Sequence, residues 1–595
     1  MLKLFKFRYI LTLAVILAVC CFTVSCGKKS GSKDDTSDAG TVSSSTQQTT
    51  APSDAGLDII DFDSQHDFCI VKDGAAACRV VCTAGASSSD STLASTIVST
   101  VSEATGVTLE VVSECGPDTE YEIVVGLGVY DKASQLYERV TYGQWSVATC
   151  GRKLIVFATD TSSFTGAGNR LRRYLSGADN GSLVLSSKIM GTETSTAIPV
   201  YIPIIEPGLY PAYIQNVGGP DTLKKCTQVA FKSVNSVVYP QYISRLEALG
   251  YEKISENEIS QNLFTTLVKD KHMLTVGYLP TSRLMRVISE PAYDTYIGDL
   301  PSGERTGAVK VMQVRDPGHG HPGAYVITLA DGRYFLYDTG YGATSETSTA
   351  PQLMEYMRQN NTFTDGKVHI AGIFISHPHP DHMGGITHLA SAYADEIVCD
   401  AVMYNFVSVD MQSVMSDSTL IQNQVSINHA AEKLGAKVYC VRAGQSFTLS
   451  GTVFSVLFTP DELGDYPLTG KNAQGESDTN YDMNNSSVIL TMSEQGQSVT
   501  FTGDCRGGEA AKVRTMYSRG FPGDIMTVAH HGYNVVATLE LYKLAQPSVL
   551  LWPIRQDDAE VSRSFVKQLQ AASYVSEHYY EDEQVELTLP YTPKG

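Results

Sequence analysis

The sequence has no Cys-x-x-C pair and, after its first 30 residues, no long run of lysine or arginine. Of its 12 cysteines, three lie within the first 26 residues and the others are widely spaced. This scattered set does not indicate a disulfide framework, and we expect buried free thiols. Acidic residues outnumber basic ones by 64 to 44, which gives a net charge of −20. Such a surface repels a long phosphate backbone, so nucleic acid is disfavoured as a partner without being excluded.

The first 26 residues have the pattern of an export signal. Basic side chains at positions 3, 6 and 8 precede the apolar run 10–22, which is shorter than the roughly 20 residues that span a bilayer. Ser25 before Cys26 resembles the lipobox of bacterial lipoproteins, although Thr23 departs from it. We therefore predict a lipoprotein signal peptide at 1–26, lipid attachment at Cys26, and an extracytoplasmic protein anchored to the bacterial cell membrane. The alternative is an ordinary signal peptide that is cleaved nearby.

Residues 27–56 contain no aromatic side chain and only one aliphatic side chain larger than alanine, Val42. A segment of this composition cannot bury enough apolar surface to fold. We predict a flexible linker with an r.m.s. span of roughly 30 Å.

Two small domains are expected next. In 57–200, Leu93, Ile97 and Val101 have helical spacing before Gly106, and "EIVVG" and "KLIVFA" are short β-type runs, which favours a small α/β domain. In 201–305, a helical stretch that ends at Gly250 precedes three alternating runs, "NLFTTLVKD", "HMLTVGYLP" and "RLMRVIS". This second pattern predicts one helix with an antiparallel sheet, a small α+β domain.

From residue 306 to 595 strands and helices alternate. "AYVITLADGRYFLYDTG" predicts a hairpin that turns at Asp331-Gly332. "VHIAGIFIS" predicts a buried strand, and "SVILTM" with "SVTFTGD" predicts a further strand pair.

The stretch "SHPHPDHMGG" follows the buried strand directly and contains His377, His379, Asp381 and His382. In an extended loop, residues two apart point the same way, so the first two histidines can face one metal ion while the other pair turns to a second. Imidazole nitrogen and carboxylate oxygen are ligands of zinc, and a catalytic zinc keeps one position open. The alternating prolines stiffen the loop. The motif predicts a metal site.

"HPHPDHMGG", the upstream "YDTG" and the later "TGD" and "AHHG" resemble the metallo-β-lactamase superfamily, in that family's order. The resemblance implies a four-layer αββα sandwich over 306–595, and hence an α/β fold class with two small α/β or α+β domains in front. It also implies that Asp504 bridges two metals, that His530 completes the shell of the second metal, and that Asp338 orients the ligand loop. His531 is expected to stabilise charge or protonate a leaving group, and Asp381 is expected to be both ligand and catalytic residue.

Most two-zinc members of this superfamily supply a further histidine before the bridging aspartate, and here the chain reads "YDMNNSS". Asn484 or Asn485 would take that place, as in the hydrolase domains of DNA-uptake competence proteins. We therefore expect zinc at two sites, one of them weaker, with manganese as an alternative. His388 and His429 lie in predicted helices and are expected to be structural.

A separate "DPGHGHPG" repeats the H-x-H spacing at His319 and His321 without a following Asp-His. These two are expected to be loop residues near the mouth of the site, either contacting substrate or without a role.

The resemblance implies a hydrolase that uses a metal-bound hydroxide. A phosphodiester of a small molecule or of a cell-surface polymer is the favoured substrate, because exported choline-phosphate esterases share the pattern. The alternatives are a nuclease and a lactone or β-lactam hydrolase. A non-catalytic cell-surface binding lipoprotein is the alternative from another class.

Overall fold

The computed structural model describes residues 67–126, 128–131, 140–178, 181–185, 201–206, 208–224, 226–315, 318, 321–342, 348–413, 419–464, 483–533, 539–560 and 564–594. The predicted signal peptide, Cys26 and the predicted linker lie outside these residues. Asp54–Gly595 forms one compact unit. None of the described helices is both long enough and apolar enough to cross a membrane.

The first part of the chain contains a mostly parallel sheet and a small antiparallel one. The five-stranded sheet has the order β4-β3-β5-β7-β6, in which only β6 is antiparallel to its neighbour. Its strands are β3 (Arg79–Val81), β4 (Val111–Val112), β5 (Glu122–Val125), β6 (Trp145–Cys150) and β7 (Lys153–Ala158). The small sheet joins β1 (Phe68–Lys72), β2 (Ala75–Ala76) and β8 (Leu183–Leu185) in the order β2-β1-β8. The sequence pattern did not predict this second sheet, because its strands are short and β8 lies far from β1 and β2 in the chain.

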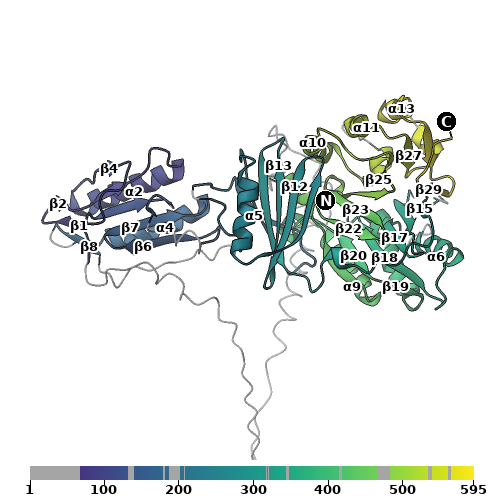
Figure 1. Cartoon of the computed structure of the whole chain (residues 1–595), viewed down its shortest axis with the longest axis horizontal. Helices are drawn as coiled ribbons and strands as arrows, with labels where there is room; N and C mark the ends of the chain where they lie inside the picture. The colour runs from purple at the N-terminus through teal and green to yellow at the C-terminus, as the bar shows by residue number, and fades with distance from the viewer. Residues whose placement is uncertain are drawn as a thin grey trace, which may run out of the picture. The chain divides into compact units, whose positions relative to one another are not determined.

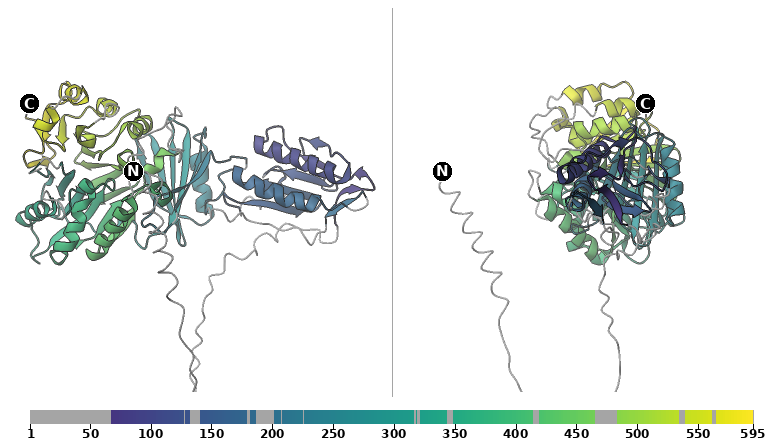
Figure 2. Two further views of the ribbon diagram at one scale, coloured as in Figure 1. Left: turned by 180° about the vertical axis from the view of Figure 1, so that it is seen from behind. Right: turned by 90° about the vertical axis from the view of Figure 1, so that its left-hand side faces the viewer.

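Two helices cover one face of the five-stranded sheet, α2 (Ser88–Thr105) and α4 (Thr161–Leu175), and they lie side by side (Figure 2, left). The Ser87 side chain caps α2 at its start, and Gly106 ends the helix with a left-handed backbone. Leu93, Ile97 and Val101 point into the core, as their spacing predicts.

The middle part is an antiparallel sheet of six strands in the order β11-β12-β13-β14-β10-β9, with one helix, α5 (Val238–Ala248), against it (Figure 1). The strands are β9 (Tyr213–Val217), β10 (Cys226–Phe231), β11 (Glu252–Ile259), β12 (Asn262–Lys269), β13 (His272–Leu279) and β14 (Leu284–Pro291). The predicted helix and the three predicted strands are confirmed. β9, β10 and β11 are additional members of the sheet.

Buried ion pairs join this middle sheet to the C-terminal part. Arg442, which is fully buried, contacts Glu290 Oε2 and Asp461 Oδ2, each at 2.9 Å. Arg286, also fully buried, pairs with Glu462. Because a buried charge is costly when it loses its partner, these pairs fix the two parts together.

The C-terminal part has two sheets. The first has the order β21-β20-β18-β17-β16-β15-β29, with β19 also paired to β18. Its strands are β15 (Val309–Gln313), β16 (Ala324–Thr328), β17 (Tyr334–Thr339), β18 (Val368–Ile375), β19 (Ile397–Cys399), β20 (Ala401–Tyr404), β21 (Lys437–Cys440) and β29 (Val585–Leu589). The second sheet has the order β22-β23-β24-β25-β26-β27-β28. Its strands are β22 (Ser446–Leu449), β23 (Thr452–Phe458), β24 (Ile489–Glu494), β25 (Gln497–Phe501), β26 (Ile525–Thr527), β27 (Val549–Trp552) and β28 (Glu577–Tyr580).

Helices cover the outer faces of both sheets, so this part is a four-layer αββα sandwich, as predicted (Figure 1). One shared apolar core lies between the sheets. On the first sheet lie α6 (Ala350–Gln359), α7 (Pro380–Ala392) and α9 (Leu420–Lys433). On the second lie α10 (Gly507–Met516), α11 (Leu539–Ala545) and α13 (Ser564–Gln570). Shorter helices are α8 (Val409–Gln412) and α12 (Gln556–Glu560).

Helix α7 packs against β17 so closely that only glycine fits at the contact. A Cβ atom built on Gly385 would lie 1.9 Å from the carbonyl oxygen of Thr339. The Gly385 N–H donates to Gly340 O at 2.7 Å, which fixes the two backbones at this separation.

Gly385→Ala should therefore destabilise the protein, by about 1–3 kcal/mol for overpacking, although alanine normally favours a helix. The control is Gly168→Ala in α4, where the new Cβ would lie 3.8 Å from Leu93 Cδ1, an ordinary contact. Chemical denaturation of both variants measures the effect. Equal unfolding midpoints for the two variants would contradict the close packing.

Candidate metal centre

The ligand loop joins β18 to α7. His377 and His379 lie in the connection, whereas Asp381 and His382 lie in the first turn of α7, which begins at Pro380. This differs from the expected fully extended loop, because a proline at the first helical position favours helix formation directly behind it. Ligands are thus supplied by a loop and by a helix N-terminus.

Asp338, at the end of β17, organises this loop. Its carboxylate accepts two hydrogen bonds from Ser376, one from the N–H and one from Oγ, both at 2.7 Å. His382 Nδ1 lies 2.8 Å from Asp338 Oδ2. All three residues are buried. Asp338 therefore fixes the strand end and the His382 ring together, and it accepts a hydrogen bond from His382 Nδ1–H, so that Nε2 faces the site.

One group of ligand atoms forms around His382 Nε2. Asp504 Oδ1 lies 3.1 Å from it, His531 Nε2 lies at 3.3 Å and Asp381 Oδ2 at 3.8 Å. His531 Nε2 also lies 3.5 Å from Asp381 Oδ2 and 3.5 Å from Asp504 Oδ1. One atom from each of the four residues thus lies within 4.8 Å of the others.

A second group shares Asp504 through its other oxygen. His377 Nε2 lies 3.7 Å from Asp504 Oδ2 and 3.1 Å from His379 Nδ1, and these three residues form the group. His530 Nε2 lies 4.0 Å from the same oxygen and 3.1 Å from Asn484 Nδ2. Asp504, which follows β25, therefore stands between the two groups.

Hydrogen bonds on the outer nitrogens leave lone pairs pointing inward. His531 Nδ1 lies 2.7 Å from Pro553 O and His530 Nδ1 lies 2.7 Å from Tyr533 O, and since a carbonyl only accepts, each Nδ1 carries the proton. The hydroxyl of Ser376 donates its one hydrogen bond to Asp338. Ser376 Oγ therefore accepts a hydrogen bond from His377 Nδ1–H, at 2.9 Å. The Nε2 atoms are thus left as ligand atoms.

The charges of the centre show the same demand for a cation. Burial disfavours an ionised imidazole, yet the surrounding carboxylates, Asp504 foremost, outweigh burial and raise the pKa of His382 well above its usual value. Burial is likewise outweighed at His531, whose pKa is raised mainly by Asp504. For Asp504, His382 and His531 overcome burial and hold the pKa well below its usual range. These directions show that the carboxylates of the centre favour a positive charge beside them.

A divalent cation fits this donor set. Asp504 Oδ1 is buried and, among the described residues, receives no hydrogen bond. Nitrogen and carboxylate oxygen ligands suit zinc, and they also suit manganese. The four atoms of the first group and the three of the second would hold one ion each, with Asp504 shared.

The structure places the adjacent histidines differently from the expectation. The sequence assigned His530 to the ion of Asp381 and His382, but His531 is the residue that lies in that group. His530 lies on the other side, with Asn484. Both histidines have left-handed backbones, with φ of 48° and 50°, and in this conformation the His531 ring lies on the Oδ1 side of Asp504 and the His530 ring on the Oδ2 side.

The remaining candidates lie where the sequence suggested or outside the site. Asn484 and Asn485 lie in a buried turn, Met483–Ser486, before β24. His388 lies 2.6 Å from Ser348 Oγ through Nδ1, and His429 is exposed on α9. Neither belongs to a ligand group. His319 lies outside the described residues.

Sequence reasoning did not find Glu581, a fully buried carboxylate whose Oε1 lies 2.8 Å from His321 Nδ1. The H-x-H spacing at 319 and 321 indicated His321, but nothing in the sequence indicated Glu581, which is 260 residues away from it.

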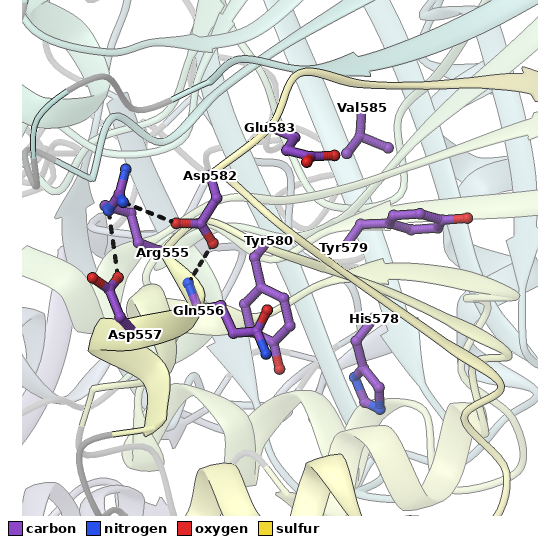
Figure 3. A pocket seen from close by; sticks show the side chains of 9 residues that line it. All are labelled: Arg555, Gln556, Asp557, His578, Tyr579, Tyr580, Asp582, Glu583 and Val585. Carbon is purple, nitrogen blue, oxygen red and sulfur yellow. Dashed lines mark hydrogen bonds and ion pairs between the residues drawn. The ribbon is translucent and has the colours of Figure 1, made fainter.

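A pocket of about 620 Å³ lies nearby, beside the loop that carries Glu581 (Figure 3). None of the ligand residues lines it. Arg555 contacts Asp557 at 3.4 Å and Asp582 at 3.3 Å, and Tyr579, Tyr580 and His578 form another part of the wall.

Part of the chain is similar in sequence to known proteins. Residues 333–519 match the family described as "Beta-lactamase superfamily domain". An uncharacterized protein of Escherichia coli K12, YcaI, is 22% identical over 229 residues, which are 38% of this chain and 23% of YcaI. Residues 333–519 are therefore similar to a beta-lactamase superfamily domain.

Solved structures of low identity also align with the chain. CmlA, a diiron β-hydroxylase from Streptomyces venezuelae, is 14% identical with a TM-score of 0.29, covering 49% of this chain and 55% of CmlA. Zn²⁺-bound PqqB from Methylobacterium extorquens is 12% identical with a TM-score of 0.29, covering 47% of this chain and all of PqqB. A metallo-β-lactamase from Staphylococcus aureus is 13% identical with a TM-score of 0.20, covering 35% of this chain and 50% of that chain.

His531→Ala should remove one of the two ions, because it deletes one of four ligand atoms around His382 Nε2. Asp504→Ala should lower the content of both, because it deletes the shared carboxylate. Metal analysis of the purified variants measures this, with His429→Ala, an exposed histidine of α9, as the control. Full metal content in His531→Ala, together with loss in His530→Ala, would restore the assignment made from the sequence.

Proposed function

We propose that the protein is a metal-dependent hydrolase with two cation sites, and that it cleaves phosphodiesters. The observation that carries the proposal is the pair of ligand groups on one buried carboxylate, Asp504. Cations bound there would lower the pKa of a coordinated water towards 7 and stabilise the negative charge of the transition state.

The chain's own residues hold and orient this chemistry. Asp338 and Ser376 keep His377 and His382 in the tautomers that present Nε2. Asp381 is the most exposed ligand of the first group, with 25% of its side chain accessible against 6% or less for the other three, and it is therefore the member of that group best placed to receive a proton from an attacking water. His531 is buried and acts as a ligand, so we do not give it the role of proton donor.

Phosphodiesters are preferred to carbonyl substrates because two adjacent cations can stabilise both the attacking and the leaving oxygen of a displacement at phosphorus. A small molecule or a cell-surface polymer would present such a bond. Long DNA is disfavoured by the net charge of −20. A lactone or a β-lactam is the second candidate for the substrate, since a water coordinated by a metal ion can also attack a carbonyl carbon.

A non-catalytic binding lipoprotein explains less. The ligand atoms are buried and close, His382 Nε2 and His531 Nε2 being 3.3 Å apart, and holding them there without a cation is costly. A protein that only bound a glycan or a partner would have no use for this arrangement.

Removal of metal should abolish hydrolysis, and zinc or manganese should restore it. The test is to treat the purified protein with a chelator, add back each ion and measure rates on bis(p-nitrophenyl) phosphate, a chromogenic lactone and a chromogenic β-lactam. The phosphodiester should be the fastest of the three substrates. If the lactone or the β-lactam is hydrolysed faster, that compound class replaces phosphodiesters as the proposed substrate. If none of the three is hydrolysed, the result favours a non-catalytic binding protein.

We also propose that the protein acts outside the cytoplasmic membrane, held by a lipid on Cys26 and a flexible linker. The pattern of residues 1–26 and the composition of 27–56 support this. The anchor would place the hydrolase near cell-surface polymers.

A fatty-acid probe should label cells that express the wild type, and Cys26→Ala should abolish the label. Cys69→Ala, a cysteine outside the signal, is the control. Secretion of an unlabelled wild-type protein into the medium would refute the anchor.

A further inference from the structure

The ligand loop between β18 and α7 has few backbone hydrogen bonds of its own. The prolines on either side of His379 have no N–H group. The carbonyl of Ser376 accepts a hydrogen bond from the Val488 N–H at 2.9 Å, and the carbonyl of His379 accepts from N–H groups in the first turn of α7. The carbonyl of Pro378, a buried residue, lies between these two. Because a buried carbonyl is costly without a partner, it requires a donor from outside the loop.

Asn423, a half-buried residue of α9, supplies that donor. Its Nδ2 lies 2.8 Å from Pro378 O, and since a carbonyl only accepts, the amide nitrogen must be the atom that faces the loop. The same nitrogen lies 3.4 Å from Thr419 Oγ1, and an NH₂ group can donate to both oxygens. Helix α9 also packs against α7, so the hydrogen bond ties the loop to a fixed element.

His379 differs from the other ligand histidines in how its ring is held. Each of the others has its Nδ1 hydrogen-bonded on the side away from the centre, namely His377, His382, His530 and His531. His379 instead directs Nδ1 inward, 3.1 Å from His377 Nε2, and its Nε2 has no hydrogen-bond partner among the described residues. The position of this ring therefore depends on the backbone of the loop, and hence on what holds that backbone.

We propose that Asn423 is a positioning residue of the metal centre, which fixes His379 through the Pro378 carbonyl and thereby sets the affinity of the second cation site. The inference rests on the two cation sites of the proposed function, the second being the group of His377, His379 and Asp504. Hydrogen bonds that orient a metal ligand commonly change metal affinity by about tenfold or more. The first site should be independent of Asn423, because Asp381 and His382 belong to α7 and not to the loop.

The alternative role for Asn423 is structural, as an anchor of α9 alone. Helix α9 offers a matched control, Asn428, whose Nδ2 donates to Pro220 O at 3.0 Å and whose Oδ1 accepts from Tyr404 Oη–H at 2.6 Å. Both asparagines are half-buried and both donate to a proline carbonyl, but Asn428 joins α9 to the middle sheet's loop and not to the ligand loop. An anchor affects stability, whereas a positioning residue affects the affinity of one ion.

The test is a calorimetric titration of the chelator-treated protein with zinc, together with chemical denaturation. In Asn423→Ala the Kd of the second zinc should rise about tenfold, while the Kd of the first stays unchanged. Asn423→Asp should weaken the second zinc at least as much, because a carboxylate cannot donate to a carbonyl. Asn423→Gln keeps the donor and should bind more tightly than Asn423→Ala. Asn428→Ala should lower the unfolding midpoint and leave both Kd values unchanged.

A double variant identifies the ion concerned. His379→Ala should remove the second zinc, and His379→Ala/Asn423→Ala should then bind the remaining zinc with the same Kd as His379→Ala alone, because Asn423 acts through His379. A further loss of affinity in the double variant would show that Asn423 acts on the first site too, and would overturn the proposal.

Unchanged zinc affinities in Asn423→Ala would also overturn it, as would an equal weakening of the second zinc in Asn428→Ala, which would make the position of α9 as a whole the cause. A wild type that binds a single zinc would refute the second site itself. These outcomes are separate from the test of hydrolysis. If Asn423→Ala weakens only the second zinc but the wild type hydrolyses no substrate, the positioning role stands and the proposed hydrolase activity is wrong.

Discussion

The structure depends on one constraint: several atoms with lone pairs are held close together in a buried space. His382 Nε2, His531 Nε2 and Asp504 Oδ1 lie within 3.5 Å of one another, and because Nδ1–H of each ring donates a hydrogen bond on the far side, the lone pair of each neutral imidazole is on Nε2. Such an arrangement is stable only with a positive charge at its centre, because lone pairs in a low dielectric repel one another strongly. In the absence of metal the imidazoles supply that charge by binding protons, and a divalent cation replaces those protons. The surrounding residues serve to keep the acceptors in place.

Close backbone contacts and strained conformations at the edges of the sheets hold the ligand atoms in place. Gly385 lets α7 approach β17, so that Asp381 and His382 reach the centre from the first turn of the helix. His530 and His531 take left-handed backbones, which let two consecutive side chains point to different ligand groups. Strain of this kind persists where the packing around it is extensive, and here the core between two large sheets and two helical layers provides that packing. The fold thus offsets a locally unfavourable geometry that the metal centre requires.

Much of this could be predicted from the sequence because the signals were local. The middle antiparallel sheet was predicted from periodicity and the ligand loop from a compact motif, whereas the sandwich was implied by the resemblance to the metallo-β-lactamase superfamily. The choice between His530 and His531 could not be predicted, because it depends on two backbone torsions that no residue pattern specifies. The small sheet of β1, β2 and β8 was missed because its strands are short and β8 is far from the other two in the chain, and the pair of His321 with Glu581 was missed because 260 residues separate them. The buried pairs of Arg442 with Glu290 and Asp461 were missed because a charged residue gives no sign in sequence that it will be buried.

The strand pairing explains why the flanks of the matched region meet at the site. Residues 333–519 include the ligand loop and Asp504, but His321 precedes them and Glu581 follows them. β29 pairs antiparallel with β15, with Val585 opposite Gln313, so the segment before β29 and the segment after β15 emerge at the same edge of the first sheet. The centre therefore combines two sources. Most of the ligand residues come from the matched region, whereas His531 and the neighbouring pair of His321 with Glu581 come from the segments on either side of it, which the pairing of β15 with β29 brings together.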